Sequence, residues 1–242
     1  LNAIGLQGVG VHRFIREYLP QLRNSGAVTI VNICGTTIEE YEELTRILSD
    51  VEGVAAIELN ISCPNIKAGG ITFGCNLAGT HDVVQAAKRA THLPVIPKLT
   101  PNVTDIASFA RVAEEAGADA VSLVNTFLAM SIDIETRRSR LANVVGGLSG
   151  PAIRPIAVRM VYECHQAVSI PIIGMGGITT ANDVLEFMIA GASAVQVGTA
   201  NFVDPYIWKK LMIGLNDYLE KHEIKRLRDI IGTLEVDLAE EA

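Results

Sequence analysis

The chain has 242 residues, about half of them apolar, so it can bury a large core as one domain or as two small ones. Its net charge of -7, with no basic run, argues against a nucleic-acid surface. The four cysteines form no C-x-x-C pair and the five histidines show no H-x-H or H-E-x-x-H spacing, so we predict no metal site.

The first part of the chain alternates helix and strand signals. Thr36 and Thr37 are each followed three residues later by a glutamate, the spacing of a capping box, which predicts that a helix begins there. Gly53 is expected to stop this helix. In order, we predict a loop over 1–7, a helix over 11–22, a strand over 28–33, the capped helix, and an apolar strand over 54–61.

That last strand ends in a thiol followed by a proline, Cys63-Pro64, with Asn60 and Asn65 on either side. Proline cannot donate to a strand ladder and disfavours helix at the residue before it, so the strand stops here. Two amides that flank a thiol suggest a polar cluster that faces a ligand. The alternative is a small buried cysteine before a turn.

The middle of the chain repeats the pattern. Residues 67–74 contain three glycines and no hydrophobic period, which suits either a mobile lid or an ordinary connection. The predicted elements that follow are a helix over 80–91, a strand over 94–99, a helix over 104–116 and a strand over 120–124.

The last part begins with an irregular excursion, expected over 127–145. Its three arginines, at 137, 138 and 140, are read as a solvated hairpin and not as a binding patch. The later predicted elements are a helix over 152–168, a strand over 171–174, a helix over 182–190, a strand over 194–197 and a polar helical end with a solvated acidic tail.

Two short patterns occur twice. Leu93-Pro94-Val95-Ile96 is echoed by residues 170–173, and residues 116–121 are echoed by 190–195, as expected of a repeated strand–helix–strand unit. Such units build either an open doubly wound sheet or a closed (β/α)8 barrel. A dinucleotide-binding sheet would carry G-x-G-x-x-G after its first strand, and this chain does not. We therefore predict an α/β fold, a (β/α)8 TIM barrel in one domain over 1–242, of which six strands are present and the first two are missing before Leu1.

In such barrels the active site lies at the carboxyl ends of the strands, and phosphate binds after the last two. Glycines at 174, 176, 177 and 198 would let backbone N–H groups approach phosphate oxygens, although tight turns also need glycine. The other strand ends are polar, and Lys98, after an apolar run, would place a fixed cation beside a bound cofactor ring.

These motifs together resemble the dihydroorotate dehydrogenase family, more narrowly its soluble class 1B catalytic subunit. The resemblance covers residues 1 to about 205. It is carried by Asn2-Ala3-Ile4-Gly5-Leu6, Asn60-Ile61-Ser62-Cys63-Pro64-Asn65, Gly146 to Gly150, Ile173 to Ile178 and Val197-Gly198-Thr199-Ala200. Gly8-Val9 departs from the family's usual Asn-Pro, which affects the stiffness of the substrate loop.

The resemblance implies a flavin-bearing barrel in which Cys63 is the catalytic base. It implies that dihydroorotate is held by Asn2, Ala3, Ile4, Gly5, Leu6, Asn60, Asn125 and Thr126. It implies FMN contacts at Asn32, Asn60, Lys98, Val124, Gly150, Gly176, Gly177, Gly198 and Thr199.

The implied reaction is oxidation of (S)-dihydroorotate to orotate in pyrimidine biosynthesis, with FMN as hydride acceptor. Electrons would pass to NAD through an iron–sulfur flavoprotein partner that carries FAD and a [2Fe-2S] cluster, around a homodimer core of a heterotetramer. The chain has no secretory signal and no apolar run that could span a bilayer, so we predict a cytoplasmic protein without membrane contact. The alternatives are the fumarate-using homodimer of class 1A, a phosphate-binding barrel isomerase without flavin, and a non-catalytic docking subunit.

Overall fold

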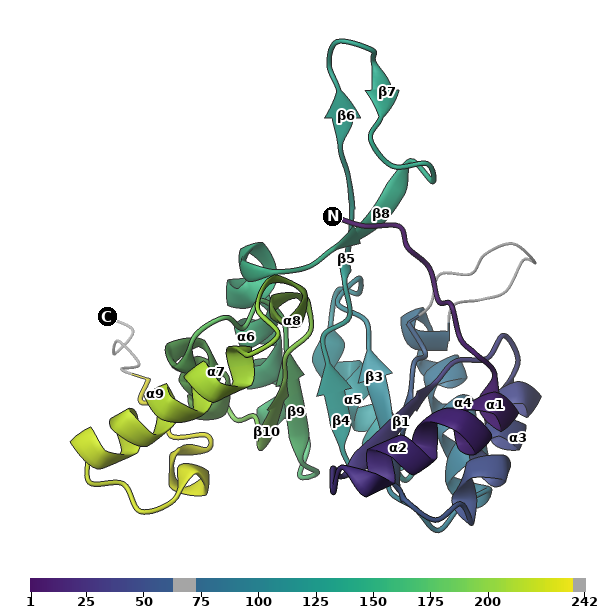
Figure 1. Cartoon of the computed structure of the whole chain (residues 1–242), viewed down its shortest axis with the longest axis horizontal. Coiled ribbons are helices and arrows are strands. Elements are labelled where there is room, and N and C mark those ends of the chain that lie inside the picture. The colour runs from purple at the N-terminus through teal and green to yellow at the C-terminus, as the bar shows by residue number, and fades with distance from the viewer. Residues whose placement is uncertain (63–72, 237–242) are drawn as a thin grey trace, which may run out of the picture.

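The structure is a computed structural model that describes residues 1–62 and 73–236. Its centre is a six-stranded parallel sheet with the order β1-β2-β3-β4-β9-β10, so strands that follow one another along the chain are also neighbours in space (Figure 1). The strands are β1 (Thr29–Ile33), β2 (Val54–Leu59), β3 (Val95–Leu99), β4 (Val121–Leu123), β9 (Ile172–Met175) and β10 (Ala194–Gln196).

Helices connect these strands, and each helix packs against the next. Contacts run from α3 to α4, α5, α6, α7 and then α9. These helices are α3 (Ile38–Ser49), α4 (Leu77–Arg89), α5 (Ile106–Glu115), α6 (Arg154–His165), α7 (Ala181–Ile189) and α9 (Ile207–Lys221). Shorter helical pieces are α1 (Val11–Arg13), η1 (Phe14–Tyr18), α2 (Leu19–Asn24), η3 (Phe73–Cys75), η4 (Pro151–Ile153), α8 (Thr199–Val203) and η5 (Leu227–Ile230).

Side chains along each strand point alternately to the two faces of the sheet, so they form two separate apolar layers. Side chains of one parity, such as Ile57, Leu59 and Leu99, join the large core between sheet and helices. Those of the other parity point to the inner side of the curved sheet, where an apolar layer contains Ala56, Ile96, Ala120 and Ile173. A parallel sheet that curves around its own apolar layer, with the connecting helices on its outer side, is the arrangement of a parallel α/β barrel (Figure 1). The predicted fold class is therefore confirmed. That two further strands precede Leu1 stays a prediction.

Side-chain caps define where several helices begin. The Thr37 hydroxyl accepts from the backbone N–H of Glu40, as the sequence spacing predicts, while the Glu40 carboxylate returns to Thr36. The Asp105 carboxylate caps α5 by accepting from the N–H of Ser108. Helix α4 begins earlier than the predicted residue 80, because the Asn76 side chain caps it by accepting from the N–H of Gly79.

The excursion over 127–145 is not irregular, contrary to the prediction. Strands β5 (Phe127–Met130) and β8 (Val145–Leu148) pair antiparallel, and β6 (Ile132–Asp133) pairs with β7 (Arg138–Ser139) beyond them. In both ladders, backbone N–H and C=O groups pair with each other within the excursion. Strands this short show too little hydrophobic periodicity in the sequence to be predicted. The N-terminal segment lies against this ribbon, where Asn2 and Gly147 exchange backbone hydrogen bonds (Figure 1).

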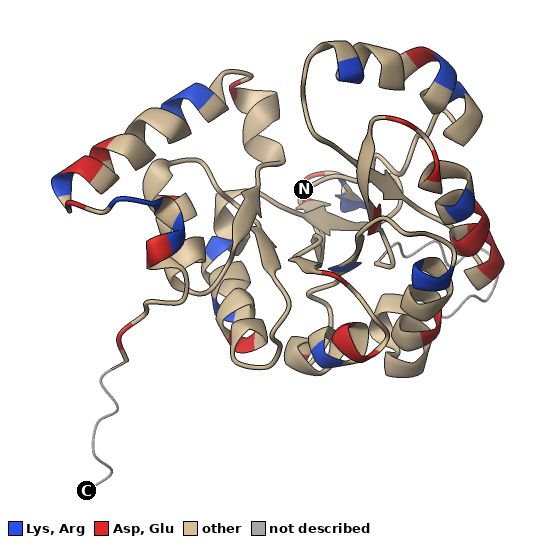
Figure 2. Ribbon diagram, turned by 90° about the horizontal axis from the view of Figure 1, so that it is seen from below, with Lys and Arg blue, Asp and Glu red and all other residues tan. Residues whose placement is uncertain are grey.

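Charged residues lie mostly on the helices that surround the sheet (Figure 2). In the described part of the chain, no helix combines the length and the apolar character that crossing a bilayer requires. The described residues also contain no group of three His, Cys, Asp or Glu side chains that could hold a metal ion.

Candidate active site

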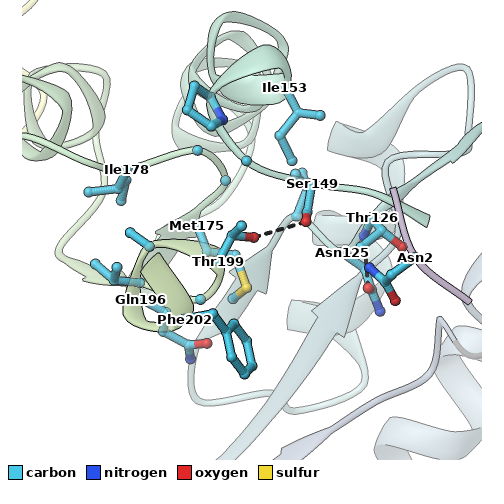
Figure 3. Close-up of a pocket in the computed structure, with 18 of the residues that line it drawn as sticks. Asn2, Asn125, Thr126, Ser149, Ile153, Met175, Ile178, Gln196, Thr199 and Phe202 are labelled. Carbon is cyan, nitrogen blue, oxygen red and sulfur yellow. Dashed lines mark hydrogen bonds between the residues drawn. The ribbon is translucent and has the colours of Figure 1, made fainter. Parts of the chain in front are cut away.

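A cavity of about 880 Å³ lies at the carboxyl ends of the parallel strands. Its walls come from the N-terminal segment, from the ends of all six strands and from the loops that follow them, as Figure 3 shows for part of the lining. The volume is in the range of small-molecule and cofactor sites, roughly 300–1,000 Å³. The position is the one where parallel barrels carry their active sites.

Most residues that the sequence placed in a site line this cavity. They are Asn2, Ile4, Gly5, Leu6, Asn32, Asn60, Lys98, Val124, Asn125, Thr126, Gly150, Gly176, Gly177, Gly198 and Thr199. Ala3 is half-buried and does not line it. Cys63 and most of the glycine-rich loop lie outside the described residues. The residue before Cys63 is anchored to β3, because the Ser62 hydroxyl donates a hydrogen bond to the backbone carbonyl of Lys98 at 2.8 Å.

Amide side chains form one wall of the cavity. Asn125 donates from Nδ2 to Oδ1 of Asn60 at 3.2 Å, and its own Oδ1 accepts from the backbone N–H of Thr126 at 2.8 Å. These two hydrogen bonds fix the orientation of the Asn60 and Asn125 side-chain amides. Asn2 reaches this wall through its backbone bridge to Gly147. Only glycine fits at position 147, because a Cβ there would lie 2.4 Å from the Thr126 hydroxyl oxygen.

Glycines form the opposite wall. Gly150, Gly176 and Gly177 have φ angles of 86°, 138° and 74°, a backbone conformation that side chains with a Cβ rarely adopt. At Gly198 a Cβ would meet no atom within 4 Å and would project into open space. Thr199 is oriented by a 2.9 Å hydrogen bond between its hydroxyl and that of Ser149 (Figure 3). Backbone without Cβ atoms beside two hydroxyls suits the approach of a phosphate group.

The floor of the cavity contains a carboxylate that the sequence reading missed. Glu58 is only 5% exposed, and its carboxylate accepts hydrogen bonds from Asn32, Ser122 and Gln196. Burial lowers the pKa of the neighbouring Lys98 ammonium, and the Glu58 charge opposes that shift. The strand alternation could have revealed Glu58, since it shares the inward parity of Asn60.

Other lining residues were not predicted as site residues, although some of them lie within the motifs of the resemblance. They are Ser149, Pro151, Ile153, Met175, Ile178, Thr179, Gln196, Val197, Ala200, Phe202, Val203, Asp204 and Ile207. Many of them are apolar, as expected of the walls that would cover a planar ring.

Fold and cavity together define a parallel α/β-barrel enzyme with a pocket at the carboxyl ends of its strands. The sequence model of the family described as dihydroorotate dehydrogenase matches residues 1–219. The chain belongs to the dihydroorotate dehydrogenase family, whose members are flavin-dependent oxidoreductases.

Curated relatives agree over nearly the whole chain. A protein of Phocaeicola vulgatus is 50% identical over 236 residues, which are 98% of this chain and 78% of the relative. Proteins of Bacteroides fragilis and Pelobacter propionicus are each 52% identical, over 98% and 97% of this chain and 78% and 77% of their own lengths. All three relatives are named dihydroorotate dehydrogenase B (NAD(+)), catalytic subunit.

The residues present fit a flavin. The open space in front of Gly198 would admit a phosphate, the apolar walls would cover a ring, and the amides of Asn32 and Gln196 could pair with its polar edge. Lys98 adds a half-buried cation to the same floor.

Proposed function

We propose that this protein oxidises (S)-dihydroorotate to orotate, with FMN as the flavin, in the biosynthesis of pyrimidine nucleotides. One observation carries the proposal: residues predicted to hold substrate and residues predicted to hold FMN line one continuous cavity. Membership of the family supplies the reaction class.

The substrate would lie against the amide wall. Asn2, Asn60, Asn125 and Thr126 provide uncharged donors and acceptors that match the ring amides and the carboxylate of dihydroorotate. The fixed orientation of Asn60 and Asn125 reduces the freedom that binding would otherwise remove. Ala3, Ile4, Gly5 and Leu6 belong to the segment expected to complete this side.

Cys63 is proposed as the base that removes the proton from C5 of the substrate. Its thiolate is the reactive form, and an unperturbed cysteine has a pKa of about 8.5, so turnover should rise with pH until Cys63 ionises. What bound FMN supplies is a two-electron acceptor for the hydride that leaves C6.

FMN would be held by residues of the floor and the glycine wall. The proposed set is Asn32, Asn60, Lys98, Val124, Gly150, Gly176, Gly177, Gly198 and Thr199. Lys98 would stabilise negative charge on the ring, and the glycines would admit the phosphate. The whole chain would then act as a single FMN-binding barrel domain.

The proposed electron acceptor is NAD, reached through a separate iron–sulfur flavoprotein subunit with FAD and a [2Fe-2S] cluster. The names of the curated relatives support this, because they specify NAD(+) and a catalytic subunit. A homodimer core within a heterotetramer and a cytoplasmic location belong to the same proposal.

An anaerobic titration of the purified, FMN-loaded protein with dihydroorotate tests the proposal. We expect the flavin absorbance to bleach stoichiometrically and orotate to appear in equal amount. Orotate added in place of dihydroorotate is the control and should leave the absorbance of the oxidised flavin unbleached. A protein that binds no flavin would point to a non-flavin barrel isomerase, and a bound flavin that dihydroorotate does not bleach would point to a non-catalytic subunit.

A further inference from the structure

A buried carboxylate joins four strands of the sheet at the cavity floor. Glu58 on β2 accepts from Asn32 Nδ2 on β1 at 2.6 Å, from Ser122 Oγ on β4 at 2.7 Å and from Gln196 Nε2 on β10 at 2.9 Å. Because β1 and β10 are the two edges of the six-stranded sheet, these bonds reach across its inner side.

The hydrogen-bond network of Glu58 borders the cavity, so it can act on a ligand bound there. The apolar layer that contains Ala56 and Ile96 is one inward-facing position closer to the amino ends of the strands than Glu58 and Lys98. Glu58, Asn32 and Gln196 all line the cavity. For stability alone, an apolar side chain would fill this place without the cost of burying a charge. The carboxylate therefore points to a role toward the cavity.

Glu58 fixes the orientation of two amides. An ionised carboxylate only accepts hydrogen bonds, so Asn32 and Gln196 must each turn their NH₂ group toward it. The amide oxygens are then left for donors on a bound ligand, such as the imide N–H of a flavin ring.

Glu58 also supplies a negative charge at the cavity floor that Lys98 lines as well. Burial lowers the pKa of Lys98, and Glu58 is the charged group that opposes this shift. Among the described residues, the inward side chains of the neighbouring strands at this level are uncharged: Asn32, Ser122, Met175 and Gln196. Asp204, at the cavity rim, is paired with Lys210 at 2.6 Å.

We propose that Glu58 is a positioning residue for the flavin, which orients the Asn32 and Gln196 amides and places a negative charge on the cavity floor that Lys98 also lines. This inference rests on the proposed binding of FMN. It assigns to Glu58 no direct contact with the reacting atoms.

The test is Glu58→Gln, which keeps the shape of the side chain and removes its charge. The new NH₂ group opposes the donors that now point at Glu58, so Asn32 is expected to flip and present a donor to the ligand. We expect the apoprotein to bind FMN about tenfold more weakly or worse, measured by quenching of FMN fluorescence. We also expect the alkaline loss of FMN binding to begin at lower pH than in the wild type, because Lys98 loses its counter-charge. Glu43→Gln, on the exposed side of α3, is the matched control and should change neither property.

The double variant Glu58→Gln/Asn32→Asp moves the carboxylate to the neighbouring strand. It restores one negative charge and an acceptor toward the cavity, so FMN affinity and the alkaline limit should return most of the way to those of the wild type. If Glu58→Gln does not fold, the FMN affinity of the double variant tests the proposal instead, because the double variant keeps one negative charge and the hydrogen bonds between positions 32 and 58.

Wild-type affinity and an unchanged alkaline limit in Glu58→Gln would overturn the inference. A folded double variant without recovery, or unfolding of both variants, would assign Glu58 a purely stabilising role and also overturn it. Failure of the wild type itself to bind FMN would instead refute the proposed function.

Discussion

Lys98 keeps an ammonium group in a place where burial works against its charge. The described residues around it provide one opposite charge, that of Glu58, and otherwise uncharged side chains. A cation held in a partly buried site acts more strongly on charge that develops nearby than a cation in water does, because less water screens it. At the scale of single residues, we therefore expect substitution of Lys98 to affect flavin reduction, and substitution of the proposed base Cys63 to affect proton removal.

Replacing Lys98 by methionine should slow flavin reduction by dihydroorotate by about 10²-fold, since it removes a fixed stabilising charge and keeps the volume. Stopped-flow absorbance under anaerobic conditions measures this rate. Lys88→Met is the control: its ammonium pairs with Asp119 at 2.7 Å on the outer surface, so its loss should leave the reduction rate unchanged. An unchanged rate in Lys98→Met would remove the proposed role of this residue.

Replacing Cys63 by alanine should leave FMN bound and abolish most turnover, because no group would take the C5 proton. The pH profile adds a second readout. In the wild type the rate should rise as Cys63 ionises and fall when Lys98 loses its proton, at a lower pH than an ordinary lysine, whose pKa is about 10.4. The rising limb should be absent from the residual activity of Cys63→Ala. Cys75→Ala, a thiol on η3 that does not line the cavity, should behave as wild type.

At the scale of elements, α7 shows how the glycine wall is held. Its capping box pairs Thr180 with Asp183, and the Asp183 carboxylate also accepts from the Thr179 N–H and bonds to Arg154 at the start of α6. Because the β9–α7 turn carries Gly176 and Gly177, this buried carboxylate links the glycine wall to two helices.

Asp183→Asn should therefore lower the free energy of unfolding by roughly 2–4 kcal/mol, since it leaves Arg154 without its buried partner. Burial raises the pKa of the Asp183 carboxyl, but the N–H donors, the Thr179 hydroxyl and Arg154 outweigh burial and hold the pKa below its ordinary value. The stabilisation is thus complete above the unfolded pKa of about 3.9 and is lost as pH falls through the folded value.

Urea unfolding at neutral pH and at a series of acidic pH values measures both effects. The difference between wild type and Asp183→Asn should shrink toward acid. Asp217→Asn, at an exposed position of α9, should be neutral throughout. A difference that stays constant with pH would exclude the carboxylate charge as the cause.

At the scale of the whole molecule, the barrel delivers electrons that must leave it. Its relatives are named as catalytic subunits, so the onward path is proposed to need a second polypeptide. The isolated catalytic protein should let dihydroorotate bleach its FMN but should reduce NAD at a negligible rate.

Adding the iron–sulfur flavoprotein subunit should raise NAD reduction by orders of magnitude without changing the rate of flavin bleaching. Fumarate is the contrasting acceptor, and rapid fumarate reduction by the isolated protein would support class 1A instead. Steady-state formation of NADH and of succinate, measured on the same preparation, separates the two classes.

The sequence by itself determined the six parallel strands, the main helices between them and their order. Caps such as Thr37 and Asp105, and apolar strands such as 54–61, depend on local chemistry and on a period of two, which a single chain displays. Family motifs also pointed to the residues that line the cavity, including Lys98, Gly176 and Gly198. The exposed hairpin of β6 and β7 agrees with the solvated hairpin expected around Arg137 and Arg138. The antiparallel ladder between β5 and β8 was missed, because short strands leave too little periodicity to detect.

Only the tertiary structure decided which side chains meet. Glu58 and Gln196 are 138 residues apart, and their hydrogen bond depends on how the sheet curves between its edges. Alternation assigns a side chain to a face, but the curvature and register of the strands determine its neighbours across that face. Glu58 was therefore identified as a candidate site residue only from its contacts in the folded structure.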